Sequence, residues 1–248
     1  MTKIVHIIRH AKLAAPYTQY MRLTFSQLCQ LSTQQINPVI HPRSQQAIAK
    51  TLAHPEMQAI ELILCSQAER TLQTAQLFAK NVGRSLPIKQ TALLNEMCFD
   101  PAQFSSAAAY AQKKMRGIRQ GVFKGMLAPD HQGVEPIAQI YARMQLLQSL
   151  LDEQPQQHIL CISHGFYMRA LHLYFVQQST APANIALRDL QHAPNYPNLA
   201  GFSIPTVWFS SSLDDQQESD LETHQELLLE SSDRTSFLIL LHSKDISL

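Results

Sequence analysis

The chain has 248 residues, 45% of them hydrophobic, and its 20 Lys and Arg nearly balance its 19 Asp and Glu, so the formal charge is +1. This composition excludes intrinsic disorder of the whole chain and supplies enough apolar side chains for a core without a disulfide or metal staple. No apolar run approaches the roughly 18 residues of a membrane helix, and Arg9 interrupts any leader-like segment, so we expect a cytoplasmic protein with no membrane contact.

Apolar, β-branched runs alternate with helix-forming stretches along the chain. The runs predict strands over 3–8, 60–65, 86–90, 158–162, 203–209 and 236–242. The stretches predict helices over 43–53, 66–82, 107–119, 136–151 and 166–176, the second with Ser66 as its N-cap. Residues 13–41 give no clear pattern. Strands that alternate with helices are typical of an α/β fold with a largely parallel sheet.

Charge is unevenly distributed despite the balanced total. Residues 214–233 hold eight acids and no Lys or Arg, so the rest of the chain has 20 basic against 11 acidic residues. We expect this acidic segment, about 211–234, to form an exposed or mobile connection. A basic body is favourable for an anionic ligand, although a solvated surface is the simpler interpretation of charge alone.

A basic cluster lies between the helical stretches 107–119 and 136–151 and consists of Lys113, Lys114, Arg116, Arg119 and Lys124. Its simplest interpretation is a solvated helical face. Aromatic residues are not interleaved with these cations as they are in proteins that stack single-stranded bases, so we expect no nucleic-acid partner.

Polar side chains follow the predicted strands at the point where each strand ends. Arg9 and His10 follow the first strand, Arg70 stands one helical turn after the second, and His164 follows the fourth. Glu96 comes shortly after the third strand. Because ligands of open α/β sheets bind outside the carboxyl ends of the strands, we expect these side chains to converge on one site.

Two arginines, two histidines and a carboxyl group suit chemistry on a phosphoryl group. The arginine fork matches phosphate oxygens with paired hydrogen bonds. Nearby cations lower the pKa of an imidazole, and only the neutral ring can attack phosphorus. A second histidine can donate a hydrogen bond to the oxygens as charge builds up. The carboxyl group can protonate the leaving oxygen and then activate water.

The motifs together resemble the histidine phosphatase superfamily, in its phosphoglycerate-mutase-like branch. They are residues 7–10 (IIRH), 65–75 (CSQAERTLQTA), 93–96 (LLNE), 162–165 (ISHG) and 240–248 (LLHSKDISL). The resemblance spans nearly the whole chain. It implies one domain, 1–248, built as a three-layer sandwich around a mostly parallel sheet, with a helical insertion at about 97–155.

The resemblance also implies roles for the motif residues. His10 would become phosphorylated, Arg9, Arg70 and His164 would bind the phosphoryl oxygens, and Glu96 would donate the proton. The backbone amide near Gly165 would add a donor to the phosphoryl site. No metal or cofactor is expected, because two arginines repel a cation and no His-Glu-x-x-His spacing exists. In this family the insertion covers the site, so the basic cluster could instead form a pocket wall for multiply charged substrates.

The first motif departs from the family pattern, which usually continues with Gly and an acidic or amide residue. Here Ala11 and Lys12 follow, and Lys12 either recruits a further anionic group or points to solvent. The expected activity is a phosphomonoesterase acting on a phosphorylated small molecule or phosphoprotein. A mutase-type phosphotransferase and a catalytically weak phosphate-binding protein remain alternatives. The sequence does not indicate the substrate or the oligomeric state.

Overall fold

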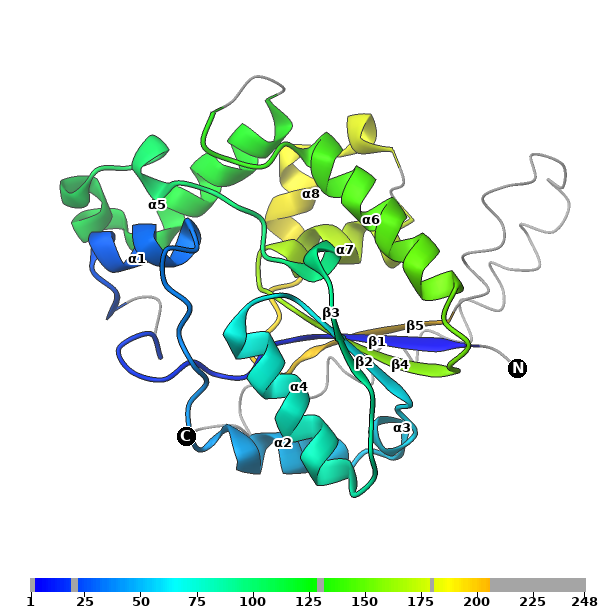
Figure 1. Cartoon of the computed structure of the whole chain (residues 1–248). Helices are drawn as coiled ribbons and strands as arrows, with labels where there is room; N and C mark the ends of the chain where they lie inside the picture. Colours follow the sequence, from blue (N-terminus) through cyan, green and yellow to red (C-terminus); the bar gives the residue numbers. More distant parts are fainter. Residues whose placement is uncertain (1–2, 19–21, 129–131, 179–180, 206–248) are drawn as a thin grey trace, which may run out of the picture.

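Five strands form one sheet in the part of the chain that the computed structural model describes, residues 3–18, 22–128, 132–178 and 181–205 (Figure 1). The strands are β1 (Ile4–Arg9), β2 (Leu62–Cys65), β3 (Ile88–Gln90), β4 (His158–Ser163) and β5 (Gly201–Pro205). Their order in the sheet is β3-β2-β4-β1-β5. Only β5 runs antiparallel, against β1, so the sheet is mostly parallel.

The central strands of the sheet are buried on both faces, because their alternate side chains pack against different helical layers. In β1, Val5 and Ile7 face one apolar cluster and Ile8 faces the other. In β4, Ile159 and Cys161 face the first cluster, whereas their neighbours face the second. Runs that are apolar at nearly every position are what a parallel sheet covered on both sides requires.

Helices cover the two faces unequally (Figure 1). One face carries α2 (Ser44–Leu52), α3 (Pro55–Gln58) and α4 (Glu69–Val82). The other carries α1 (Phe25–Ser32), α5 (Ala107–Leu127), α6 (Ile137–Asp152), α7 (Tyr167–Phe175) and α8 (Leu187–His192). Short 3₁₀ turns lie at Ala92–Leu94, Pro101–Gln103 and Pro182–Asn184. The expected three-layer sandwich is therefore confirmed. The segment 97–155, which was predicted to be a helical insertion, contains α5 and α6.

The basic cluster lies within a helix rather than between two helices, which corrects the predicted end at residue 119. Helix α5 continues to Leu127, and the whole helix contains three glycines that each cost roughly 1 kcal/mol of helix propensity. Packing offsets this cost, because Ile118, Val122 and Phe123 are buried in the core. Gly121 has a packing reason of its own, since a Cβ there would lie 2.9 Å from Phe104 Cδ1.

Other predicted elements keep their places with small shifts at the ends. The strand expected from residue 203 begins at Gly201, and α1 lies in the stretch 13–41 that gave no pattern. A capping box between Thr24 and Gln27 starts α1. The acidic segment, the strand predicted over 236–242 and the motif 240–248 lie outside the described residues.

Candidate active site

The carboxyl ends of three neighbouring strands meet at one edge of the sheet. Arg9 at the end of β1 is in register with Ser163 of β4, and Cys65 of β2 is in register with Ile162 of β4. The residues that follow these strands therefore start from adjacent points. This register, rather than any sequence proximity, brings His10 and His164 together, with ring centroids 5.3 Å apart and the ring planes tilted by 58°.

His10 is buried and its ring is oriented by one hydrogen bond. Its Nδ1 lies 2.7 Å from the carbonyl oxygen of Ala11, an acceptor, so Nδ1 carries the proton. The lone pair of the neutral ring is then on Nε2. Burial lowers the pKa of His10 well below 6.5, and the guanidinium groups of Arg70 and Arg9 lower it further. A neutral imidazole with an unprotonated Nε2 is the nucleophilic form of this side chain.

His164 sits between Arg70 and Ser66. Arg70 Nε donates to His164 Nδ1 over 3.2 Å, so the ring proton is on Nε2, which lies 2.7 Å from Ser66 Oγ. Burial and the neighbouring Arg70 hold the pKa of His164 well below 6.5. Ser66 Oγ also accepts from the Ala68 amide and pairs with the Thr71 hydroxyl at 2.8 Å. Both ring nitrogens of His164 and the Ser66 hydroxyl therefore have hydrogen-bond partners.

Ser66 is not the N-cap predicted for the second helix. Helix α4 begins three residues later, at Glu69, and its N-cap Ala68 offers no side-chain acceptor. Asn37 Oδ1, from a loop 32 residues earlier, accepts from the Glu69 amide instead at 3.0 Å. The Ser66 hydroxyl is therefore available for His164, a function that the sequence pattern did not reveal.

Arg9 points to the opposite helical layer from Ile8, as expected from strand alternation. Its Nη1 donates to the carbonyl oxygen of Tyr196 at 3.0 Å, and its buried Nε has no hydrogen-bond partner among the described residues. Gly165 packs against the guanidinium, because a Cβ there would lie 3.1 Å from Arg9 Cζ. Lys12, by contrast, lines neither of the two cavities described below, although its backbone oxygen accepts from the His41 amide.

Glu96 stands at the amino end of α7. One carboxylate oxygen accepts from the Tyr167 amide at 2.8 Å and the other from the Phe166 amide at 3.2 Å. Burial raises the pKa of Glu96, although these two amides and the nearby Arg70 and Arg9 oppose the increase. A carboxyl group that retains its proton more readily than an exposed one is suited to general-acid catalysis.

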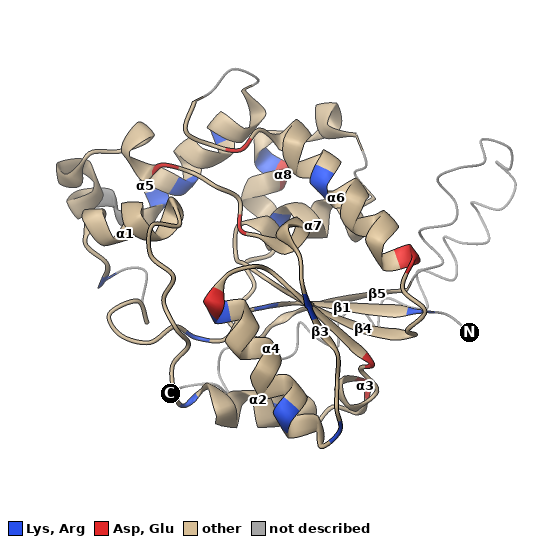
Figure 2. Ribbon diagram, viewed as in Figure 1, with Lys and Arg blue, Asp and Glu red and all other residues tan. Residues whose placement is uncertain are grey.

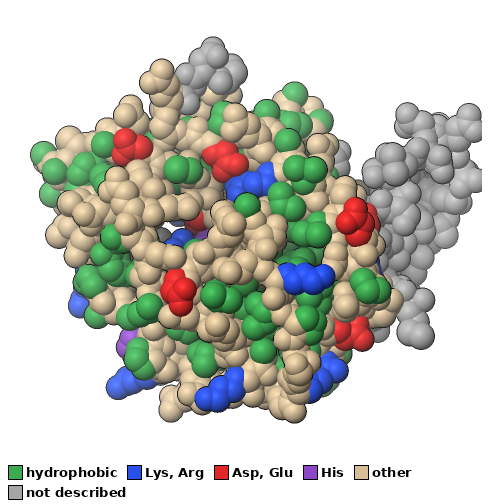
Figure 3. Space-filling view, viewed as in Figure 1, with side chains coloured by type: hydrophobic (Ala, Val, Ile, Leu, Met, Phe, Trp, Pro, Cys, Tyr) green, Lys and Arg blue, Asp and Glu red, His purple; other side chains and the backbone are tan. Residues whose placement is uncertain are grey.

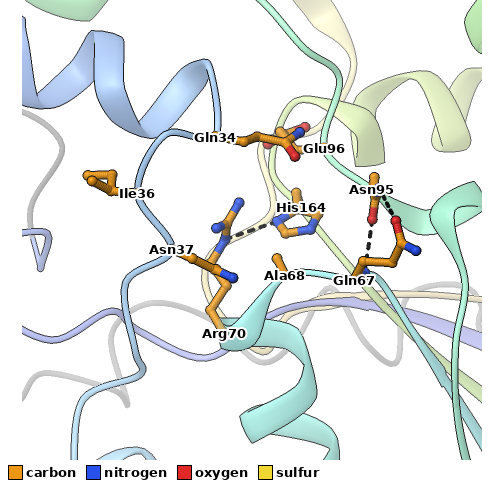
Figure 4. Close-up of a pocket in the computed structure, with 9 residues that line it drawn as sticks. All are labelled: Gln34, Ile36, Asn37, Gln67, Ala68, Arg70, Asn95, Glu96 and His164. Carbon is orange, nitrogen blue, oxygen red and sulfur yellow. Dashed lines mark hydrogen bonds between the residues drawn. The ribbon is translucent and has the colours of Figure 1, made fainter.

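Two cavities share Glu96. The first, of about 100 Å³, is lined by Arg70, His164, Ala68, Ile36 and four amide side chains: Gln34, Asn37, Gln67 and Asn95 (Figure 4). The second, of about 360 Å³, is lined by Arg9, Glu96, Met115, Arg116, Arg119, Gly165, Phe166, Arg169 and Asn195. Figure 3 shows a hollow in which basic, acidic and histidine side chains are visible together.

The structure brings together five of the residues expected at the site: Arg9, His10, Arg70, Glu96 and His164. It adds amide side chains from the loop after α1 and a buried arginine, Arg169, that sequence reasoning missed. Arg169 did carry a signal, because a charged residue within the apolar stretch of α7 needs a reason to be buried.

Among residues that the structure describes, no group of three or more His, Cys, Asp or Glu side chains could hold a metal ion. No helix in the same part of the chain has the length and apolar character needed to cross a membrane.

Comparison with known structures supports the fold. A mycobacterial glucosyl-3-phosphoglycerate phosphatase complexed with VO3 is similar over 81% of this chain and 90% of its own, with 16% identity and a TM-score of 0.55. A phosphoglycerate mutase from Bacillus anthracis is similar over 82% of this chain and 88% of its own, with 14% identity and a TM-score of 0.53. A putative alpha-ribazole-5'-P phosphatase from Escherichia coli is similar over 83% of this chain and 91% of its own, with 18% identity and a TM-score of 0.52.

Family assignment rests on sequence. The comparison with curated proteins gave no match. A family model described as histidine phosphatase superfamily (branch 1) matches residues 5–193, which is most of the chain and includes both histidines, both arginines and the carboxyl group of the site. The chain therefore belongs to branch 1 of the histidine phosphatase superfamily.

Proposed function

We propose that the protein is a phosphomonoesterase that works through a phosphohistidine on His10 and needs no metal. The observation that carries this proposal is the hydrogen bond from His10 Nδ1 to the Ala11 carbonyl, which directs the proton away from Nε2. The low pKa of the buried ring keeps Nε2 unprotonated at neutral pH, as a nucleophile requires.

In the first half-reaction, His10 Nε2 attacks the phosphorus atom and the bond from phosphorus to the ester oxygen breaks. Arg9 and Arg70 bind the phosphoryl oxygens and offset their negative charge. Glu96 gives its proton to the departing oxygen, so the product leaves as a neutral alcohol and Glu96 becomes a carboxylate.

In the second half-reaction, water attacks the phosphorus atom of the phosphohistidine. The Glu96 carboxylate takes a proton from that water, the bond from phosphorus to Nε2 breaks, and inorganic phosphate leaves. Both His10 and Glu96 return to their starting protonation states. Glu96 lines both cavities, so the leaving group, and afterwards water, can lie next to its carboxylate.

Substitution of the nucleophile tests this proposal. We expect His10→Ala and the larger His10→Gln to lose turnover of an aryl phosphate by about 10³-fold or more, because no other group can form the intermediate. The matched control is His192→Gln, which removes an exposed histidine on α8. Circular dichroism verifies folding, and rapid acid-free quenching with ³²P-labelled substrate measures label on the protein.

Four outcomes separate the alternatives. Label trapped on wild type but not on the His10 variants, with release of inorganic phosphate, supports the proposal. With a phosphorylated diol as the labelled substrate, transfer of the label to its second hydroxyl identifies a mutase-type phosphotransferase. Binding of phosphate or vanadate without any label on His10 identifies a phosphate-binding protein and contradicts the proposal, as does turnover that depends strictly on a divalent metal.

A further inference from the structure

The ion pair between Arg143 and Glu135 is largely buried, although neither residue takes part in the proposed reaction steps. Arg143 Nη2 donates to Glu135 Oε2 at 2.9 Å, and the two side chains are 15% and 18% exposed. Arg143 comes from α6, and Figure 2 shows the basic position of that helix in the same helical layer as α7. Because removing two charges from water offsets most of their attraction, a buried pair of this kind contributes little stability and needs another reason.

The pair restrains both ends of the short segment that contains Glu96. At one end, Arg143 Nη1 donates to the carbonyl oxygen of Asn95 at 2.8 Å. At the other end, the Glu135 amide donates to the carbonyl oxygen of Cys98 at 3.0 Å. Residues 95–98 belong to no helix or strand, so regular backbone hydrogen bonds do not fix their position. These two contacts therefore restrain the backbone on either side of Glu96.

Arg143 also contacts the residue that binds the Glu96 carboxylate. Its Cζ lies 4.1 Å from the centroid of the Tyr167 ring, a cation–π contact. The backbone amide of the same Tyr167 donates to Glu96 Oε1 at 2.8 Å. One guanidinium thus links α6 both to segment 95–98 and to the amino end of α7, and Glu96 lies where these two parts of the chain meet.

The opposite charges of the pair matter because Glu96 becomes negative during the reaction. Burial raises the pKa of Glu135, the neighbouring Arg143 opposes this increase, and the charge of Glu96 adds to it. Glu135 and Glu96 are therefore close enough for their charges to interact. With Arg143 as its partner, the Glu135 carboxylate repels the carboxylate that forms on Glu96 less strongly than an unpaired one would.

We propose that Arg143 and Glu135 are positioning residues for the proton donor: they hold segment 95–98 against the amino end of α7, so that the Glu96 carboxyl group reaches the leaving oxygen. Neither residue lines either cavity, so both act through Glu96. This inference rests on the proposed function, in which Glu96 protonates the leaving group. Loss of Arg143 should therefore impair proton donation more than it impairs binding of the phosphoryl group.

The test uses two esters whose leaving groups differ in their need for a proton. 4-Nitrophenolate departs readily as an anion, whereas the alcohol of propyl phosphate must be protonated as it leaves. For Arg143→Met, which keeps an unbranched side chain but removes the donors, we expect kcat/KM to fall about 10- to 100-fold on propyl phosphate. On 4-nitrophenyl phosphate we expect a fall of less than threefold. A general loss of folded enzyme would lower both values equally.

Two further variants separate position from charge. The double variant Arg143→Met with Glu135→Gln removes both charges together, so it leaves no buried carboxylate unpaired and should keep the selective loss. Arg143→Lys keeps the charge but lacks the fork that reaches Asn95 and Glu135 at once, so it should lose about tenfold on propyl phosphate. The matched control is Arg188→Met, which removes a paired arginine on α8 that is 82% exposed. It should leave both esters within twofold of the wild type.

Glu96→Gln is the reference variant, because its selective loss on propyl phosphate defines the effect of a missing proton donor. The same selectivity in Arg143→Met and in the double variant supports the proposal. Equal losses on the two esters in those variants, or no loss, overturn the proposal while the proposed function stands. If Glu96→Gln itself loses both esters equally, Glu96 is not the proton donor, and the proposed function and this inference fail together.

Discussion

At the scale of single residues, the hydrogen bonds of His164 determine which of its nitrogens carries the proton. Arg70 donates to Nδ1, so the neutral ring donates from Nε2 to Ser66. In that tautomer, Nδ1 has no proton to offer a phosphoryl oxygen. The Ser66 hydroxyl oxygen accepts the hydrogen bond from Nε2. Ser66 is therefore a positioning residue that holds His164 in the tautomer protonated at Nε2.

Substitution of this hydroxyl should slow turnover. We expect Ser66→Ala to lower kcat about 10- to 100-fold, the usual effect of removing a group that orients a reactive imidazole. ¹⁵N NMR of the His164 ring should show a changed ratio of tautomers, which a loss of packing alone would not produce. Ser149→Ala, at an exposed position on α6, is the control and should match the wild type. An unchanged tautomer ratio in Ser66→Ala would contradict the assignment.

The sequence predicted the residues of this site better than it predicted their partners. Arg9, His10 and His164 follow apolar strands, so their convergence is a consequence of parallel topology. The bond between Ser66 and His164 joins residues 98 positions apart, and the local pattern around Ser66 indicated a helix cap instead. The sequence around a serine does not indicate which of several possible hydrogen-bond partners its hydroxyl contacts in the fold.

At the scale of elements, β5 packs unusually closely against β1. A Cβ on Gly201 would lie only 1.8 Å from the carbonyl oxygen of Ile7, so no side chain fits between the two strands. Gly83 has a different requirement: it ends α4 with a φ of 75°, and nothing lies within 4 Å of a Cβ there. One glycine is needed for space and the other for backbone conformation.

The two glycines should therefore respond differently to alanine. We expect Gly201→Ala to lower the free energy of unfolding by about 3 kcal/mol, because the two strands must separate. Gly83→Ala should cost about 1 kcal/mol, the ordinary cost of a left-handed residue with a side chain. Urea denaturation measures both. Equal costs would mean that β5 can move away from β1 more easily than this packing implies.

Helix ends were harder to predict than helix positions. Composition alone suggested that α5 stops near residue 119, where the stretch rich in helix formers ends; two glycines, Gly121 and Gly125, follow before the helix ends at Leu127. The buried side chains of Ile118, Val122 and Met126 sustain the helix, and this tertiary contribution cannot be read from helix propensity. Two members of the basic cluster, Arg116 and Arg119, line the second cavity, whereas Lys124 in the continuation does not.

At the scale of the whole molecule, several histidines are buried in neutral form. Burial lowers the pKa of His6 to about 4, and the pKa values of His10 and His164 also lie well below 6.5. The unfolded chain binds protons at these positions below pH 6.5, whereas the folded chain does not. Their contribution to stability is therefore present above pH 6.5 and is lost as the pH falls toward the folded pKa.

His6 isolates this effect because it lies outside the proposed site. Between pH 6.5 and 5, a histidine that stays neutral in the fold lowers the free energy of unfolding by roughly 1.5 kcal/mol. We expect His6→Gln to lose less stability than the wild type over this interval, by about that amount. Urea denaturation at the two pH values measures the difference, with His192→Gln as an exposed control. Identical losses of unfolding free energy in the wild type, His6→Gln and His192→Gln would show that folding does not lower the pKa of His6.

The pairing of β1 has a consequence for how the protein is made. Both neighbours of β1 come late in the chain, and the Asn198 side chain donates to the His10 carbonyl from 188 residues away. Tyr196 likewise accepts from Arg9 across 187 residues. Strand β1 is translated before both of its partner strands, so its pairing in the sheet is incomplete until β4 and then β5 have been synthesised. His10 is thus held in place in part by segments that are translated well after it.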